Sequence, residues 1–204
     1  MSRQPHATLA GNPVHMIRPH LRDVPDIGLP EGYAIRPLRV EEGTVWNDVV
    51  LDAEPWLDLS EKLFTDEFAH DLSSVPKRCF FVVDETDEPV GTASAWYKDG
   101  HRGLDYGLIH WVAVRPAYQG KGLGKAVLAY ALQKLSHWHE RALLGTQSKR
   151  LPAITLYLDF GFLPDLQNPD VVEDWRLLRT QLNHSVLDSI CLLYTSDAAD
   201  EGHC

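Results

Sequence analysis

The segment His110–Val127, HWVAVRPAYQGKGLGKAV, holds the clearest pattern in this chain of 204 residues. It begins with an apolar, extended stretch that ends at Val114, before Pro116, and it continues with glycines at every second position. From Leu123 onward the apolar residues repeat at helical spacing. The segment therefore predicts a strand, a glycine-rich turn and a helix that follow one another directly.

The turn predicts a binding site for a phosphate group. Its glycines are Gly120, Gly122 and Gly124. Backbone N–H groups at the start of a helix lack partners within the helix, and glycine lets an anion approach them closely. A P-loop is excluded because Gln119 stands where that motif needs glycine and Ala126 where it needs Ser or Thr. The dinucleotide fingerprint is excluded because Lys125 replaces its last glycine. A tight turn without a ligand remains the alternative.

The remaining periodicities predict one mixed α/β domain over residues 31–182, after a proline-rich N-terminal extension at 1–30 that shows neither helical nor strand periodicity. Strands are expected at 33–38, 79–83, 90–97, 104–114, 142–144, 162 and 175–180. Helices are expected at 40–54, about 60–72, 123–135 and 152–159. This order is typical of a sheet covered by helices.

The composition is that of a soluble folded protein, with 44% hydrophobic and 24% charged residues. The formal net charge of −10 disfavours nucleic acid as a partner, because a duplex-binding protein needs a basic surface. No apolar run approaches the ~20 residues that span a bilayer, and the first 30 residues contain no apolar segment of a secretory signal. We therefore expect a cytoplasmic protein without a membrane partner. The cysteines, Cys79, Cys191 and Cys204, have no metal-ligand spacing, so no metal site is expected.

The glycine turn and its flanks resemble the acetyl-CoA motif of the GNAT (GCN5-related) N-acetyltransferase superfamily. That motif reads Gln/Arg-x-x-Gly-x-Gly/Ala, and Gln119, Gly122 and Gly124 match it. Farther along the chain, AITLYLDFGF at 153–162 resembles the second motif of the family, with its alanine, tyrosine and Gly–Phe pair. The two motifs occur in the family's order, and the resemblance covers roughly residues 32–180.

The resemblance implies a mixed central sheet with helices on both faces, whose splayed central strands hold acetyl-CoA as co-substrate. The backbone of Val112 and Val114 would bind the pantetheine arm. The pyrophosphate would lie at the turn, against Gln119, Gly120, Gly122, Leu123, Gly124 and Lys125. Tyr157 would protonate the departing thiolate, as the matching tyrosine commonly does in the family. A core aromatic with a satisfied hydroxyl is the alternative for Tyr157.

A second catalytic group has to remove a proton from the acceptor, because alkyl amines are mostly protonated at pH 7. Family members often carry a glutamate four residues before the last valine of the long strand, and His110 stands there. A free histidine has a pKa of about 6.5, which suits a base near neutrality. Asp105, His101 or a chain of waters are substitutes for His110 as the base, and a structural histidine is the alternative. A bulge in this strand would change which face His110 occupies.

The acceptor is expected to be a small cationic amine, such as a polyamine or an amino-sugar antibiotic. Residues 40–71 contain ten acidic residues and one basic residue, Lys62. In the GNAT fold this region overhangs the acceptor pocket, and the expected substrate contacts are Asp52, Glu54, Trp56 and Asp58. Solvated helix faces are the alternative explanation of these charges. A peptide acceptor, a longer acyl-CoA, or a domain that senses acetyl-CoA without turnover also remain open, and a homodimer is compatible with the family.

The end of the chain resembles foreign sequence. Residues 191–201, CLLYTSDAADE, resemble the translation of a sequencing-library adaptor over all eleven positions. The resemblance implies read-through from fragmented DNA, with the native sequence ending near Ile190. We expect residues 183–204 to be a non-native tail and infer no function from them.

Overall fold

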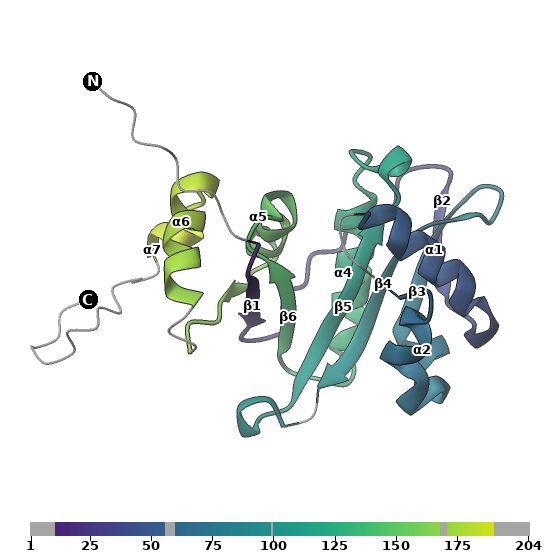
Figure 1. Ribbon diagram of the computed structural model, residues 1–204, viewed down its shortest axis with the longest axis horizontal. Helices are drawn as coiled ribbons and strands as arrows, with labels where there is room; N and C mark the ends of the chain where they lie inside the picture. The colour runs from purple at the N-terminus through teal and green to yellow at the C-terminus, as the bar shows by residue number, and fades with distance from the viewer. Residues whose placement is uncertain (1–10, 56–59, 99, 168–170, 190–204) are drawn as a thin grey trace, which may run out of the picture. The chain divides into compact units, whose positions relative to one another are not determined.

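The computed structural model describes residues 11–55, 60–98, 100–167 and 171–189, and it divides the chain into two compact units. The central unit comprises residues 19–142. The terminal unit comprises residues up to 18 together with those from 143 onward. Figure 1 labels most of the helices and strands of both units. No helix in the described ranges is both long and apolar enough to cross a membrane.

The sheet of the central unit contains four antiparallel strands in the order β2-β3-β4-β5. Their bounds are β2 Tyr33–Pro37, β3 Cys79–Asp84, β4 Pro89–Lys98 and β5 Tyr106–Val114. The helical segments are η1 Val40–Glu42, α1 Gly43–Ala53, α2 Leu63–Phe68, η2 Ala69–Ser74, α3 Val75–Arg78, η3 His101–Gly103, η4 Pro116–Tyr118 and α4 Leu123–Leu135. The strand, turn and helix expected around the glycines are therefore confirmed as β5, its following turn and α4.

Helices cover both faces of this sheet, as Figure 1 shows. Consecutive residues of a strand point to opposite faces, so β3 identifies the helices on each side. The ring of Phe80 packs against Tyr130 of α4, with 5.0 Å between the ring centroids. Its neighbour Phe81 belongs to the hydrophobic cluster that also contains Trp46 of α1 and Phe68 of α2. α4 therefore covers one face, and α1 with α2 covers the other.

The side chains that periodicity assigned to the core are buried. In α2 they are Leu63, Phe64 and Phe68, and in α4 they are Leu123, Val127, Ala131, Leu132 and Leu135. Cys79 is also buried, and its burial raises the pKa of the thiol to about 12. The thiolate is therefore disfavoured, which agrees with a packing role for this cysteine.

Two contacts fix the start of α2 against α1. A Cβ on Gly43 would lie 2.4 Å from Cδ1 of Phe64, so the glycine lets this aromatic ring pack directly on the first turn of α1. The buried side chain of Asn47 accepts a hydrogen bond from the N–H of Phe64 at 2.8 Å and donates one to the carbonyl of Glu61. Since these backbone groups lie before the helix ladder of α2 is complete, Asn47 satisfies them and sets the position of α2.

Among its described residues, the terminal unit has strands in the order β6-β1-β7 and helices α5, α6 and α7. The strands are β1 Pro13–Arg18, β6 Ala142–Gln147, whose first residue lies in the central unit, and β7 Leu163–Pro164. The helices are α5 Leu151–Asp159, α6 Val172–Leu182 and α7 Ser185–Ser189. β1 and β7 are antiparallel, with Met16 opposite Pro164. The glycine expected after α5, Gly161, has a φ of 77°, as a residue just beyond a helix end often does.

The expected strand at 175–180 is wrong, because these residues belong to α6. The buried residues Val172, Trp175 and Leu178 recur every three positions, which is a helical and not an extended spacing.

The N-terminal segment also differs from its expectation, since residues 13–18 form β1. Val14, Met16 and Arg18 alternate into the interior of the unit. Arg18 is buried because its NH1 donates a hydrogen bond to the carbonyl of Phe160 at 2.7 Å. Two apolar residues and one arginine are too short a pattern to reveal a strand by periodicity.

In the expected tail, residues 185–189 form α7, where Leu187 is fully buried, and the remainder from 190 to 204 lies outside the described residues.

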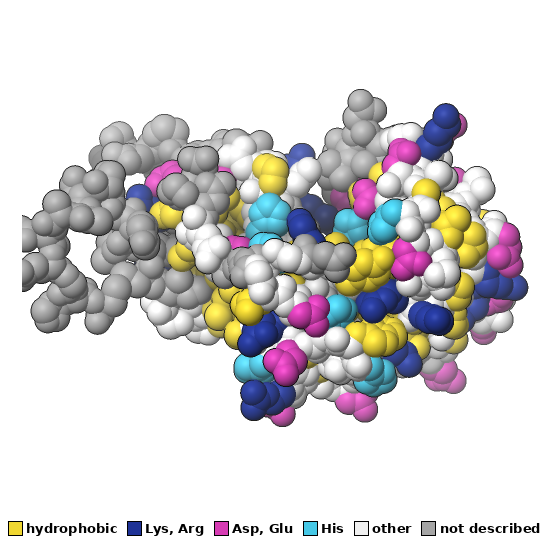
Figure 2. Space-filling view, turned by 90° about the horizontal axis from the view of Figure 1, so that it is seen from below, with side chains coloured by type: hydrophobic (Ala, Val, Ile, Leu, Met, Phe, Trp, Pro, Cys, Tyr) yellow, Lys and Arg dark blue, Asp and Glu magenta, His cyan; other side chains and the backbone are white. Residues whose placement is uncertain are grey.

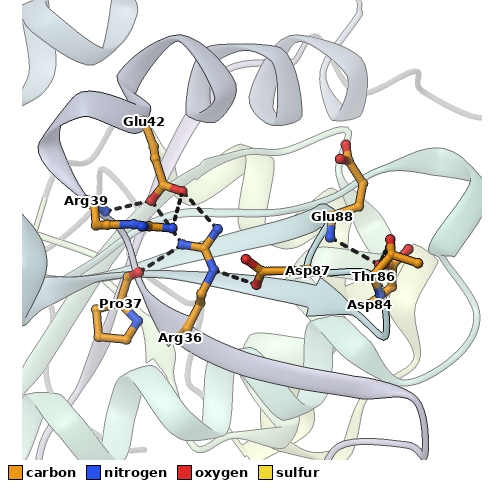
Figure 3. Close-up of polar contacts among 8 residues, drawn as sticks. All are labelled: Arg36, Pro37, Arg39, Glu42, Asp84, Thr86, Asp87 and Glu88. Atoms are coloured by element: carbon orange, nitrogen blue, oxygen red, sulfur yellow. Dashed lines mark hydrogen bonds and ion pairs between the residues drawn. The ribbon is translucent and has the colours of Figure 1, made fainter.

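An arginine on β2 ties three segments of the central unit together, as Figure 3 shows. The guanidinium of Arg36 donates two parallel hydrogen bonds of 2.9 Å to the carboxylate of Glu42 and a third of 2.9 Å to Asp87 in the β3–β4 turn. The backbone and side chain of Arg39 donate two more to Glu42. The hydrogen bond with Arg36 is the main cause that lowers the pKa of Glu42 from 4.5 to about 2.

We predict that Glu42→Gln lowers the free energy of unfolding at pH 7 by about 1–2 kcal/mol, since it removes one of the two carboxylates that bind Arg36. A carboxyl whose pKa is lower in the folded state stabilises the fold fully above its unfolded pKa of 4.5, and this stabilisation is lost as the pH falls through about 2. Urea denaturation of both proteins from pH 7 to pH 3 checks this. A difference that stays constant down to pH 3 contradicts it.

Gly107 of β5 faces α4 at a position with no room for a methyl group. A Cβ there would lie 2.4 Å from Cγ of Leu135. We predict that Gly107→Ala lowers the free energy of unfolding by about 1–3 kcal/mol, because the strand or Leu135 has to shift. Gly28→Ala is the matched control, since nothing lies within 4 Å of its Cβ position. Equal changes in the two urea midpoints would refute this account of the packing.

Candidate active site

The glycine turn presents an open set of backbone N–H groups. Gly120 and Gly122 have φ angles of 77° and 84°, which L side chains rarely adopt, and nothing lies within 4 Å of a Cβ at either position. Gly122 is the N-cap of α4 and supplies no side-chain cap. The first N–H groups of α4 therefore have neither a helical partner nor a capping side chain, and they carry the positive end of the helix dipole.

The turn is anchored to the end of β5. The side-chain amide of Gln119 donates a hydrogen bond of 2.9 Å to the carbonyl of Val114. Cγ2 of Val114 in turn lies 3.9 Å from the position of a Cβ on Gly124. These contacts hold the strand end, the turn and the first turn of α4 together. Gln119 was predicted to contact the cofactor, and in the structure its side chain links the turn to the end of β5.

Two lysines accompany the turn. Lys125 lies exposed in the first turn of α4. The ammonium of Lys121 lies 3.1 Å from the hydroxyl of Tyr33 and 5.0 Å from the ring centroid of Tyr118. Both lysines add positive charge beside unpartnered N–H groups, which makes this end of the unit suited to a phosphate-bearing ligand.

A bulge interrupts the pairing of β5 with β4. Thr92 pairs with Ala113 and Ser94 pairs with His110, so two residues of β5 stand opposite Ala93. One of them, Trp111, has a φ of 48°, an unusual value for a bulky residue. The extra residue turns Trp111 to the same face of the sheet as His110. Because α1 and α2 cover that face, both side chains lie beneath them.

The side chain of His110 contacts a glutamate on α2 at hydrogen-bond distance. Its Nε2 lies 2.7 Å from Oε2 of Glu67, and both side chains are about one-third exposed, at 29% and 31%. The ring of Trp111 packs against His110 on one side and Trp46 on the other, with centroid distances of 5.3 and 5.7 Å. His110 is therefore partly accessible and held in one orientation by two neighbours.

The hydrogen bond with His110 lowers the pKa of Glu67 below its ordinary value, against the opposing effect of burial. The carboxylate is consequently ionised at neutral pH and can only accept hydrogen bonds. Glu67 was not among the predicted site residues. Its position four residues after Leu63 and three after Phe64, on the edge of the buried stripe of α2, is the signal that would have identified it.

Asp105 and His101, the other residues considered as the general base, lie far from the glycine turn. Asp105 immediately precedes β5 and is paired with Nδ1 of His139 at 2.8 Å. His101 lies in η3, where its ring packs against Tyr106. Both are at the opposite end of β5 from the glycine turn, about 30 Å away for a strand of this length. His110 is the titratable group of this set that β5 carries toward the turn.

The acidic residues expected to attract a cationic amine are partly engaged within the protein. Oδ2 of Asp52 lies 3.2 Å from NH1 of Arg115. Glu54 is buried, with 3% of its surface exposed. Trp56 and Asp58 lie outside the described residues. Asp52 and Glu54 are therefore weaker attractors for a free cation than their charges alone suggest.

Tyr157 lies on α5 in the terminal unit. Its side chain is buried, and its ring makes an edge-to-face contact with Phe162 at 6.0 Å. Ile154, on the same helix face, is also buried. Both the acid and the core-aromatic interpretations are compatible with this burial.

A separate cavity of about 300 Å³ adjoins the other end of α4. Its lining residues are Pro19, His20, Leu21, Arg22, Ser136, His139, Glu140 and Arg141. The 13 residues of α4 separate it from the glycine turn by about 20 Å. Figure 2 shows basic, acidic and histidine side chains next to one another on the face that it displays. Within the described ranges, no group of three or more His, Cys, Asp or Glu residues is arranged to hold a metal ion.

The model of the Acetyltransferase (GNAT) family matches residues 40–162, more than half of the chain. The chain belongs to this family. The match spans β5, the glycine turn, α4 and α5, so the family assignment and its mixed α/β fold with helices on both faces of the sheet are confirmed. Members of the GNAT family use acetyl-CoA as co-substrate.

Two curated relatives and one solved structure illustrate the similarity. The L-methionine sulfoximine/L-methionine sulfone acetyltransferase of Salmonella typhimurium is 29% identical over 128 residues, covering 62% of this chain and 69% of that protein. The mycothiol acetyltransferase of Kytococcus sedentarius is 27% identical over 154 residues, covering 69% of this chain and 48% of that protein. A GCN5-related N-acetyltransferase from Sphaerobacter thermophilus has a TM-score of 0.59 at 20% identity, over 76% of this chain and 50% of that one. The chain thus spans about half the length of the last two proteins.

The glycine turn fits acetyl-CoA. A pyrophosphate needs several N–H donors that it can approach closely, and at positions 120 and 122 the turn has no side chain and nothing within 4 Å of a Cβ position. Lys121 and Lys125 supply positive charge beside it. The residues that would hold the co-substrate are those of the turn and the first turn of α4.

We predict that Gly122→Ala weakens coenzyme A binding at least about tenfold, since a methyl group intrudes on the cradle and strains the backbone. Gly103→Ala is the matched control, because Gly103 also has a positive φ of 66° and open space but lies at the far end of β5. Isothermal titration calorimetry measures both affinities. Equal weakening by the two substitutions would show that the turn does not hold the co-substrate.

Proposed function

We propose that this protein is an N-acetyltransferase that moves the acetyl group of acetyl-CoA directly to a primary amine of a small molecule. The proposal is carried by two features that occur together on one strand. Open N–H groups lie at the end of β5, and His110, four residues before that end, is accessible and paired with a carboxylate. The cradle supports binding of the co-substrate. His110 supports turnover beyond binding.

In this proposal the central unit binds and orients the co-substrate. The N–H groups of Gly120, Gly122, Leu123, Gly124 and Lys125 hold the pyrophosphate, which Lys125 also neutralises. The backbone of Val112 and Val114 binds the pantetheine arm, as in the family that the chain belongs to. The bulge supports this role, because it leaves backbone groups of β5 outside the regular ladder with β4.

His110 acts as the general base. It accepts a proton from the protonated acceptor amine, and the freed lone pair of the nitrogen attacks the carbonyl carbon of the thioester. The N–C bond forms, the C–S bond breaks, and the departing thiolate takes a proton from Tyr157, in the role that the family gives to the matching tyrosine. The nitrogen loses its second proton to water as the amide forms, and water returns a proton to Tyr157. A positioned general base contributes about 10²–10⁴-fold to such a reaction.

The acceptor is a small amine, and two chemical classes are supported by different observations. The excess of acidic residues between positions 40 and 71, with Glu67 beside His110, favours a cationic amine such as a polyamine or an amino sugar. The substrates after which the Salmonella relative is named favour an amino-acid amine. Because the internal pairing of Asp52 weakens the charge argument, both classes belong in the first substrate panel.

The experiment that tests the proposal measures release of the free coenzyme A thiol from acetyl-CoA, with residues 191–204 removed. The panel contains polyamines, amino sugars, and methionine analogues that carry a free α-amine. Turnover on one class establishes the enzyme and identifies the acceptor. Tight binding of acetyl-CoA without turnover on any amine, or on a peptide panel, would replace the proposal with a sensor domain.

We predict that His110→Phe and Tyr157→Phe each lower kcat by about 10²-fold or more and leave the affinity for coenzyme A unchanged, because the proposal gives each side chain a role in proton transfer and not in holding the pyrophosphate. Steady-state kinetics and calorimetry separate the two effects. Unchanged turnover in either variant would remove that residue from the mechanism.

A further inference from the structure

Glu67 contacts only one of the two nitrogens of His110. Oε2 of Glu67 lies 2.7 Å from Nε2. In the part of the chain that the structure describes, no hydrogen bond reaches Nδ1 of the same ring. The two nitrogens of a neutral imidazole differ in role, since one carries the proton and the other offers a lone pair. The identity of the nitrogen that faces Glu67 therefore decides which one is basic.

An ionised carboxylate can only accept a hydrogen bond. The lowered pKa of Glu67 means that it is ionised at the pH at which an acetyltransferase works. Nε2 of neutral His110 must then carry the proton in the 2.7 Å contact, and the lone pair lies on Nδ1. Charge adds to this effect, because the carboxylate also stabilises the imidazolium that forms when Nδ1 accepts a proton.

We propose that Glu67 is a positioning residue that fixes His110 in its Nε2–H tautomer and so makes Nδ1 the atom that accepts the proton of the acceptor amine. This inference rests on the function proposed above. It adds a residue and an atom that the GNAT assignment does not supply, because the contact comes from α2 and not from the strand that carries the motif.

The elements around Glu67 are built to hold this contact. Asn47 of α1 binds the backbone on both sides of the start of α2, and Gly43 lets Phe64 pack directly on α1. On the sheet side, the bulge places the ring of Trp111 against His110. The ring of Trp111 in turn packs against Trp46. Contacts between α1 and α2 thus fix the position of the carboxylate, and the bulge of β5 fixes the position of the imidazole.

The proton balance of the step is simple. The amine R–NH₃⁺ gives one proton to Nδ1, while Nε2–H stays hydrogen-bonded to the carboxylate of Glu67. The resulting imidazolium is neutralised by Glu67 until the proton passes to water. Glu67 changes no covalent bond and does not itself become protonated, so its contribution is orientation and charge.

The first test is kinetic and uses Glu67→Gln with Asp66→Asn as the matched control. Asp66 precedes Glu67 on α2, is exposed, and loses the same charge without touching His110. Glu67→Gln is expected to lower kcat about 10- to 100-fold, a part of the ~10²–10⁴-fold that a general base supplies, with the KM for acetyl-CoA unchanged. Asp66→Asn is expected to change kcat by less than about twofold.

A double-mutant cycle separates action through His110 from a general structural effect. If Glu67 acts through His110, Glu67→Gln lowers kcat no further when His110→Gln is already present. An equal loss in both backgrounds would overturn the proposal, as would a kcat of Glu67→Gln equal to that of Asp66→Asn. Thermal unfolding of each variant identifies any loss that comes from misfolding.

The second test reads the tautomer without any turnover. Two-bond ¹H–¹⁵N spectra of the full chain at pH 8.5, assigned with His110→Gln, are expected to show the Nε2–H form in the wild type and a mixture of both forms in Glu67→Gln. An Nδ1–H form in the wild type overturns the proposal. If the Nε2–H form depends on Glu67 but no amine is acetylated, the positioning role stands and the proposed acetyl transfer fails.

Discussion

The bulge in β5 is the constraint on which the candidate site depends. Without the extra residue opposite Ala93, Trp111 would point toward α4 and His110 would stand alone under α2. A tryptophan at a φ of 48° costs of the order of 1–3 kcal/mol. This cost is offset by the packing of its ring against Trp46, in the cluster that α1 and α2 form over the sheet. Strain in one residue therefore places an aromatic neighbour against the predicted base.

The proposed function gives β5 two roles, because its carboxyl end and its middle have different neighbours. At its carboxyl end, Gln119 bonds to Val114 and holds a turn whose N–H groups are open to an anion. Four residues earlier, the face toward α2 offers an imidazole paired with a carboxylate. The family assignment explains the first arrangement. The second is a property of this chain, since it needs Glu67, Asn47 and Trp111 together.

The local sequence predicted the features that depend on residues close together in the chain. The stripe of α4, the glycine turn before it, and strands β3 to β5 were all identified, because their spacing reflects burial on one face or a turn that needs glycine. The method failed where the pattern was short or ambiguous. Trp175 and Leu178 of α6 were assigned to a strand, and three alternating residues in β1 were not recognised. Both elements owe their stability to partners distant in the sequence, such as Asp174 with Asn12 and Arg18 with Phe160.

The sequence by itself determined the family, the position of the glycine turn and the choice of His110, because each is written in contiguous residues with a fixed spacing. Only the tertiary structure decided which partner each acidic residue binds. Between positions 40 and 71 ten acids look alike in the sequence, yet Glu42 binds Arg36, Asp52 binds Arg115 and Glu67 binds His110. The partners of these acids are separated from them by between 6 and 63 residues. No spacing rule in the sequence predicts which distant residue a charged side chain binds. The packing of α1 and α2 on the sheet determines these partners.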